Sequence, residues 1–168
     1  MGRYDILTGR VKPTKHRRVE PAESWDVEGF FNLTLKLVNE MMSRLSEETY
    51  QNLKRIDPPE LYKKDHATFR LSLPRRMGNT TLATKLFEHY LNQGENVFLS
   101  VPARHYIRNI PWSASTERAP ITRIITPQMN DLYGIDPSII IVDMVTYMKP
   151  EQLEIIYNVR SDFYILLG

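Results

Sequence analysis

The sequence has 168 residues, of which 42% are hydrophobic and 25% are charged, with a formal net charge of +2 and no cysteine. This length and composition predict one globular domain, and the lack of cysteine excludes disulfides and cysteine-ligated metal, as expected in a reducing cytoplasm. The longest unbroken apolar run, residues 139–142, is far shorter than the roughly 20 residues of a membrane-spanning helix. Residues 1–10 also lack an apolar run of signal-peptide length. We therefore expect a cytoplasmic protein with no membrane partner.

Residues 1–23 are interpreted as an irregular basic leader, because Pro13 and Pro21 interrupt any regular element. Its segment from residue 10 to residue 18 carries six basic residues, with no acid until Glu20: Arg10, Lys12, Lys15, His16, Arg17 and Arg18. We interpret them as a solvated terminus, with an arm that contacts phosphates as the alternative.

Residues 24–65 are expected to form a helical elaboration that packs on the main sheet. Apolar residues recur at spacings of three and four over residues 30–45, which predicts a helix from about Ser24. A second, shorter helix is expected after Ser46, with acids in its first turn. It should end before the breaker Pro58–Pro59.

From residue 66 to residue 168 the pattern alternates between strands and helices. Strands are expected at 67–73, 96–101, 121–126, 138–142 and 162–167, and helices at 80–92 and 151–159. Gly94 is expected to cap the first of these helices and Pro150 to open the second. Residues 138–142 are the kind of apolar run that lies buried on both faces of a parallel sheet. The alternation predicts an α/β fold, a three-layer sandwich with a mostly parallel sheet.

The stretch from Pro74 to Thr81 reads Pro-Arg-Arg-Met-Gly-Asn-Thr-Thr and joins an expected strand to an expected helix. A helix start exposes backbone N–H groups and the positive end of the helix dipole, which together bind phosphate. Gly78 allows the backbone to wrap closely around an anion, and the hydroxyl of Thr80 stands where such loops bind Mg²⁺.

Over residues 68–168 this sequence resembles the nucleotide-binding domain of large terminases, the ATPases that package viral DNA, and more loosely that of DExx-box helicases. Residues 74–81 are similar to their Walker A phosphate loop at every position but one. Residues 139–143 are similar to a Walker B strand whose aspartate, here Asp143, supports Mg²⁺, and residues 163–168 to the strand that follows it.

The resemblance implies a P-loop NTPase-like core over residues 66–168, with ATP and Mg²⁺ as cofactors if the site is retained. It also implies a viral origin and a location in the host cytoplasm. Thr80 and Asp143 are the implied metal ligands. The implied nucleotide-binding residues are Arg75, Arg76, Gly78, Asn79, Thr80 and Thr81.

Two departures from the family pattern bear on the chemistry. Asn79 stands where the family has a lysine that reaches the β- and γ-phosphates, and Met144 stands where a water-activating glutamate is usual. Lys85 lies about 9 Å along the helix and is not expected to reach back, whereas Arg75 or Arg76 could supply charge from the loop.

We therefore expect a degenerate P-loop protein that binds nucleotide weakly or without hydrolysis and acts as an accessory or regulatory protein. One alternative is an active ATPase that uses Arg75 or Arg76 and borrows a group from a neighbouring subunit. The other is an interaction protein with no nucleotide site. No catalytic residue is assigned.

Residues 102–120 combine arginines with aromatic residues and prolines, and a loop of this length without regular structure is often functional. Three interpretations stay open: an ordered surface loop with an aromatic residue tucked inward, a surface for a protein partner, or a clamp for nucleic acid. A protein partner is expected, with nucleic acid and an oligomer as further candidates. The residues concerned are Arg104, Arg108, Trp112 and Arg118.

Other polar residues are given ordinary structural interpretations. Asp131 and Asp136 precede the 138–142 strand beside turn-forming residues and are interpreted as turn formers. The four histidines show no metal-ligand spacing, so no metal site is expected from them.

Overall fold

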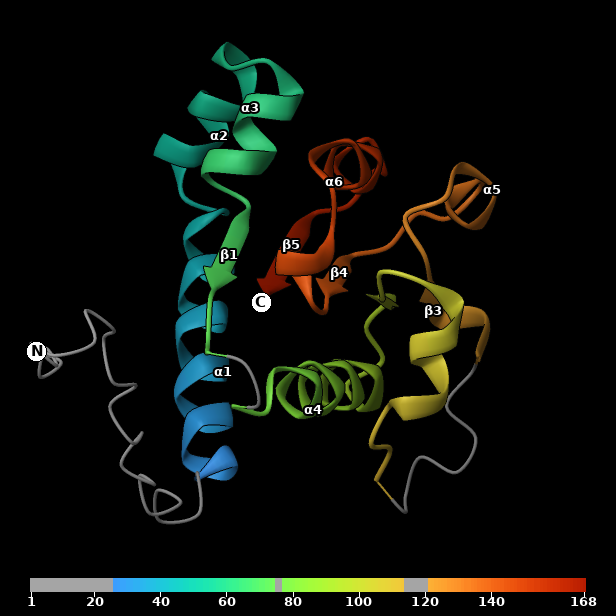
Figure 1. Cartoon of the computed structure of the whole chain (residues 1–168). Coiled ribbons are helices and arrows are strands. Elements are labelled where there is room, and N and C mark those ends of the chain that lie inside the picture. The colour runs from blue at the N-terminus through green and yellow to red at the C-terminus, as the bar shows by residue number, and fades with distance from the viewer. Residues whose placement is uncertain (1–25, 75–76, 114–120) are drawn as a thin grey trace, which may run out of the picture.

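The computed structural model describes residues 26–74, 77–113 and 121–168. Their centre is a parallel sheet of five strands (Figure 1), ordered β1-β5-β4-β2-β3. The bounds of the strands are β1 (Thr68–Leu71), β2 (Val97–Ser100), β3 (Ile124–Ile125), β4 (Ile139–Val142) and β5 (Phe163–Leu167). The predicted α/β fold with a parallel sheet is confirmed.

The three inner strands are buried along their whole length, as predicted for residues 138–142. Successive side chains point to opposite faces of a strand, and each face supports its own hydrophobic cluster. Ile139 and Ile141 of β4 belong to one cluster, while Ile140 and Val142 belong to the other. Burial on both faces explains why these segments read as unbroken apolar runs rather than as alternating patterns.

Helices cover both faces of the sheet and give three layers (Figure 1). The helices α1 (Val27–Arg44) and α4 (Asn79–Asn92) pack on one face, and α5 (Met129–Leu132) and α6 (Pro150–Tyr157) pack on the other. As predicted, Gly94 follows α4 with a positive φ of 84° and donates its N–H to the Leu91 carbonyl oxygen. Pro150 is the first residue of α6, also as predicted.

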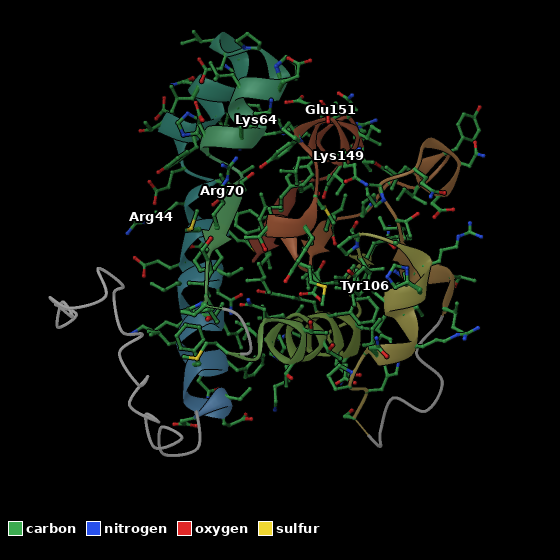
Figure 2. All side chains as sticks on the ribbon, in the orientation of Figure 1. Arg44, Lys64, Arg70, Tyr106, Lys149 and Glu151 are labelled. Atoms are coloured by element: carbon green, nitrogen blue, oxygen red, sulfur yellow. The ribbon has the colours of Figure 1, made fainter. Side chains whose placement is uncertain are left out.

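The remaining helices, α2 (Glu48–Ile56) and α3 (Pro59–Asp65), continue from α1. The Tyr90 hydroxyl of α4 donates to Asn39 Oδ1 of α1 at 2.9 Å. On the other side, Lys64 of α3 lies 2.6 Å from Glu154 of α6. Arg70 of β1 donates to the Tyr157 hydroxyl of the same helix at 3.1 Å. Lys64 and Arg70 are labelled in Figure 2. Residues 27–65 thus touch the core at both α4 and α6.

The structure corrects four details of the predicted elements. Pro58–Pro59 ends α2, but Pro59 also opens α3, because a missing N–H is harmless at the first helical position. The strand predicted at 121–126 is only β3, since residues 121–123 form the short 3₁₀ helix η3. Residues 104–109 of the presumed irregular segment form another, η1 (Arg104–Asn109). Asp131 is not a simple turn former, because it lies in α5 and binds Thr126 and Arg104.

Among the helices of the described residues, none combines the length and the apolar character needed to cross a membrane.

Candidate functional site

The candidate site lies at the carboxyl edge of the sheet, where two crossovers leave in opposite directions. In the first crossover the chain leaves β1 at one edge of the sheet, passes through α4 and enters β2 on the far side of β5 and β4. In the second it leaves β4, passes through α6 and enters β5, which lies back toward β1. Right-handed crossovers in opposite directions place their helices on opposite faces. The loops after β1 and β4 therefore diverge and leave a crevice, which is where open α/β sheets bind ligands.

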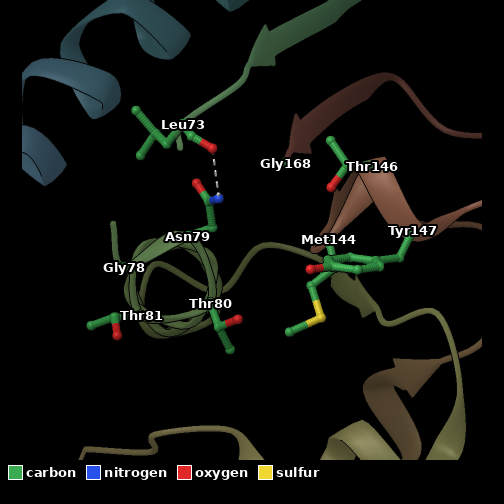
Figure 3. Close-up of a pocket in the computed structure, with 9 residues that line it drawn as sticks. All are labelled: Leu73, Gly78, Asn79, Thr80, Thr81, Met144, Thr146, Tyr147 and Gly168. Atoms are coloured by element: carbon green, nitrogen blue, oxygen red, sulfur yellow. Dashed lines mark hydrogen bonds between the residues drawn. The ribbon is translucent and has the colours of Figure 1, made fainter. Parts of the chain in front are cut away.

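A cavity of about 610 Å³ occupies this crevice (Figure 3). Its volume is typical of small-molecule sites. The segments that follow β1, β4 and β5 all contribute to its wall. The lining residues are Leu73, Gly78, Asn79, Thr80, Thr81, Met144, Thr146, Tyr147 and Gly168.

The start of α4 forms one wall of the cavity. Gly78 precedes the helix in the left-handed conformation with φ 83°, which a glycine adopts without strain. It makes no side-chain cap, and the first turn carries no acidic residue. The first N–H groups of the helix have no intrahelical partner and no acidic residue in their own turn, so the dipole at this end of the helix favours an anion.

Asn79, the first residue of α4, turns its side chain back on the loop. Its side-chain Nδ2 donates to the Leu73 carbonyl oxygen at 3.4 Å, a long hydrogen bond across the segment between β1 and α4 (Figure 3). Its Oδ1 is buried and has no hydrogen-bond partner among the described residues. The amide thus holds the loop but adds no positive charge.

Asp143 follows β4 and is only 2% exposed. Its backbone N–H donates to the Ser100 carbonyl oxygen at 2.9 Å, which ties the end of β4 to β2. Burial raises the pKa of this carboxyl group, although hydrogen bonds from the Thr80 side chain and the Met144 backbone act in the opposite direction. Its Oδ1 has no hydrogen-bond partner in the described part of the chain, so a buried acceptor stands beside the start of α4.

The opposite wall is the 3₁₀ helix η4 (Val145–Tyr147). Met144 before it has φ 57°, the one positive φ outside glycine among the described residues. Strained backbone of this kind concentrates at functional sites. The backbone of Gly168 packs directly against η4, because a Cβ at this position would lie only 2.9 Å from the backbone nitrogens of Val145 and Thr146.

The side chains at this site provide some, but not all, of the oxygen ligands that a hard divalent cation needs. The Thr80 hydroxyl and the free Oδ1 of Asp143 are oxygen donors of the type that Mg²⁺ prefers. No cluster of three or more acidic or histidine side chains occurs among the described residues. A Mg²⁺ ion here would therefore depend on water and on ligand phosphates for most of its coordination, which is usual for this ion.

The structure brings together the predicted residues Gly78, Asn79, Thr80 and Thr81, which line the cavity, and Asp143, which borders it through Thr80. Arg75 and Arg76, like the basic leader, lie outside the described residues. Lys85 points away from the site and pairs with Glu28 of α1 at 2.6 Å, as the helix geometry predicted.

The four residues predicted to form a partner surface differ in exposure. Arg104 and Arg108 are exposed on η1, and Arg104 pairs with Asp131 at 2.8 Å. Trp112 is half-buried and packs edge-on against Phe87 of α4, with ring centroids 5.9 Å apart. Arg118 lies outside the described residues. A contribution of these side chains to a partner surface stays a prediction.

Sequence reasoning did not find Thr146, Tyr147 or Gly168 as cavity residues. Their only sequence signal is position, because they follow predicted strands whose carboxyl ends meet at one edge of a parallel sheet. The order of the strands was needed to bring them opposite the start of α4.

The sequence matches no protein-family model, and a search of curated proteins finds no significant match.

Proposed function

We propose that this protein is a degenerate P-loop protein that binds a nucleotide phosphate at the start of α4 and does not hydrolyse it by itself. The observation that carries the proposal is the pairing of a helix start without a side-chain cap, after a left-handed Gly78, with the buried Asp143, whose Oδ1 has no partner among the residues that the structure describes. A phosphate would accept from the N–H groups of the helix, while Asp143 and Thr80 would face the accompanying Mg²⁺.

The same site supports binding better than hydrolysis. A water-activating base is absent from the position after Asp143, where Met144 stands. The Asn79 amide carries no charge to stabilise a transferring phosphoryl group, and such electrostatic stabilisation supplies most of the catalysis in phosphoryl transfer. We therefore propose an accessory or regulatory role, exerted through contacts with a protein or a nucleic acid, for which the exposed Arg104 and Arg108 are the candidate surface.

Thermal unfolding with and without Mg-ADP, Mg-ATP and magnesium pyrophosphate tests the binding. A ligand at 100 times its dissociation constant adds about 2.7 kcal/mol to the free energy of unfolding, so wild type should melt at a higher temperature with these ligands. Thr80→Val should reduce the magnesium-dependent part of the shift, whereas the matched control Thr80→Ser keeps the hydroxyl and should preserve it. Asn79→Lys should increase the shift.

The alternatives give different results. Phosphate release from Mg-ATP above the level of Asp143→Ala would favour an active ATPase. No shift with any of the three ligands, in wild type or in Asn79→Lys, would favour an interaction protein without a nucleotide site.

A further inference from the structure

Two neighbouring leucines of α1 point away from the domain. Leu33 is 53% exposed and Leu37 is 43% exposed. They lie about one helical turn apart, so they form one apolar patch on the same face of the helix. Figure 1 shows α1 at the side of the domain, next to the edge strand β1. Exposed apolar side chains that adjoin one another are candidates for contact with another molecule.

Other faces of α1 are held by contacts within the domain. Val38 is fully buried in the cluster that α4 also joins. Asn39 accepts a hydrogen bond from the Tyr90 hydroxyl of α4. The orientation of α1 is therefore fixed, and it presents Leu33 and Leu37 on a rigid element rather than on a loop, which lowers the entropy lost when another molecule binds.

A charged residue flanks the two leucines on each side at the same spacing. Asp26 precedes Leu33 by seven residues, and Arg44 follows Leu37 by seven residues. Seven residues make nearly two helical turns, so the four positions share one face of the helix. Asp26 is the N-cap and continues the same spiral, because Phe30 donates its N–H to the Asp26 carbonyl oxygen at 3.1 Å. The face thus has an acid at one end and a base at the other.

This order is complementary to a copy of itself when the second helix runs in the opposite direction. The two leucines and the two charged residues are both centred on residue 35. A two-fold axis there places Leu33 opposite Leu37 of the second copy and Asp26 opposite its Arg44. A parallel pair would bring like charges together at both ends. In the antiparallel register the other charged residues of α1 come opposite uncharged ones: Glu28, Lys36 and Glu40.

We propose that a second copy of this chain docks on this face, so that two α1 helices pack antiparallel with the leucines at the centre and an Asp26–Arg44 ion pair at each end. Two-fold pairing through one self-complementary patch is the commonest form of association among soluble proteins. Arg44 also pairs with Glu40 of its own helix, but both side chains are more than half exposed, and such a pair contributes little. Two helices of this length bury less than the roughly 1,600 Å² of a standard interface, so the dimer should be weak, with a dissociation constant in the micromolar range.

Sedimentation equilibrium of the full chain at increasing micromolar concentrations measures this association. Wild type should shift from monomer to dimer as the concentration rises. Leu33→Lys should weaken the dimer roughly tenfold or more, because it removes apolar contact from both halves of the interface. The matched control is Leu61→Lys, since Leu61 is 45% exposed but belongs to α3. This control should leave the dimer unchanged.

Reversal of the end charges tests the antiparallel register. Asp26→Lys and Arg44→Glu should each weaken self-association roughly 5- to 10-fold, because each variant sets like charges opposite each other at both ends of its dimer. An equimolar mixture of the two variants should associate about as well as wild type. In the mixed dimer both ends again join opposite charges.

Three results would overturn the proposal. They are a wild-type monomer at every concentration, a dimer that Leu33→Lys leaves intact, and a mixture of the charge variants that associates no better than either variant alone. Circular dichroism should show that the variants are folded, because the replaced side chains are exposed. Leu37→Lys provides a second variant of the same patch and should have the same effect as Leu33→Lys.

Discussion

Single side chains show that a residue's role depends on which groups the fold places beside it. Asp131 accepts hydrogen bonds from the Thr126 hydroxyl and N–H and from Arg104. Asp136, five residues later, lies 4.0 Å from Arg160 with both side chains largely exposed. Two aspartates with the same sequence interpretation thus differ in burial and in partners.

Asp131 is expected to make stability depend on pH. The Thr126 hydroxyl, and then Arg104, hold the pKa of Asp131 below its ordinary value of 3.8, although its partial burial acts in the opposite direction. Because the folded pKa is the lower one, the stabilisation is present above pH 3.8 and is lost as pH falls through the folded pKa. Asp131→Asn should reduce the free energy of unfolding at pH 7 by about 1 kcal/mol, measured by urea denaturation.

The control for this effect is Asp136→Asn, because the exposed pair with Arg160 contributes at most a few tenths of a kcal/mol. The deficit of Asp131→Asn relative to wild type should shrink when the denaturation is repeated at pH 3. A deficit of the same size at both pH values would show that the charge of Asp131 is not its cause.

At the scale of elements, α3 is joined to α6 by two neighbouring lysines that make different contacts. The Lys63 ammonium donates to the carbonyl oxygens of Tyr157 and Val159, at 2.9 and 3.2 Å, where α6 ends. Lys64 instead pairs with Glu154, whose side chain is 55% exposed. The first contact satisfies backbone acceptors that the helix itself leaves free, while the second is a surface ion pair.

Lys63→Met should therefore destabilise the protein more than Lys64→Met. Removing the charged donor at a helix C-terminus should cost about 1–2 kcal/mol, whereas the exposed pair contributes roughly 0–1 kcal/mol. The two changes have the same chemistry at adjacent positions, so the difference between their urea midpoints isolates the contact of Lys63 with the backbone at the end of α6. Equal midpoints would mean that Lys63 does not stabilise the end of this helix.

For the whole molecule, the burial of the strands predicts an order of local stability. The strands β2, β4 and β5 are buried throughout and lie inside the sheet. By contrast, β3 has only two residues, which are buried but pair with β2 alone at the sheet edge, and it follows the exposed Ile121. Segments with few buried contacts open locally at a lower free energy than the core does.

Native-state hydrogen exchange followed by mass spectrometry should show this order. Amides of the three inner strands should exchange only on global unfolding, whereas residues 121–125 and η1 should exchange earlier. Mg-ADP, if it binds as proposed, should slow exchange in the first turn of α4 and in η4, which face the same cavity. Early exchange in β4 would contradict the assignment of the core.

The sequence predicted the long elements of the fold better than the short ones. The apolar runs and the periodic helices predicted most of the sheet and α1, α2, α4 and α6, because burial on one face or on two leaves a pattern in a single segment. The 3₁₀ helix η1 and the shortened β3 were missed, since short elements at an edge are decided by their neighbours rather than by their own periodicity.

The sequence by itself determined the α/β class, the helix start after Gly78 and the uncharged side chain of Asn79 at that start, because each depends on residues close together in the chain. Only the tertiary structure decided the strand order, and with it the meeting of α4 with Asp143, Tyr147 and Gly168. These residues come from three loops far apart in the chain. They become neighbours because opposite crossovers open a crevice at the carboxyl edge of the sheet, a property of the assembled fold that no single segment carries.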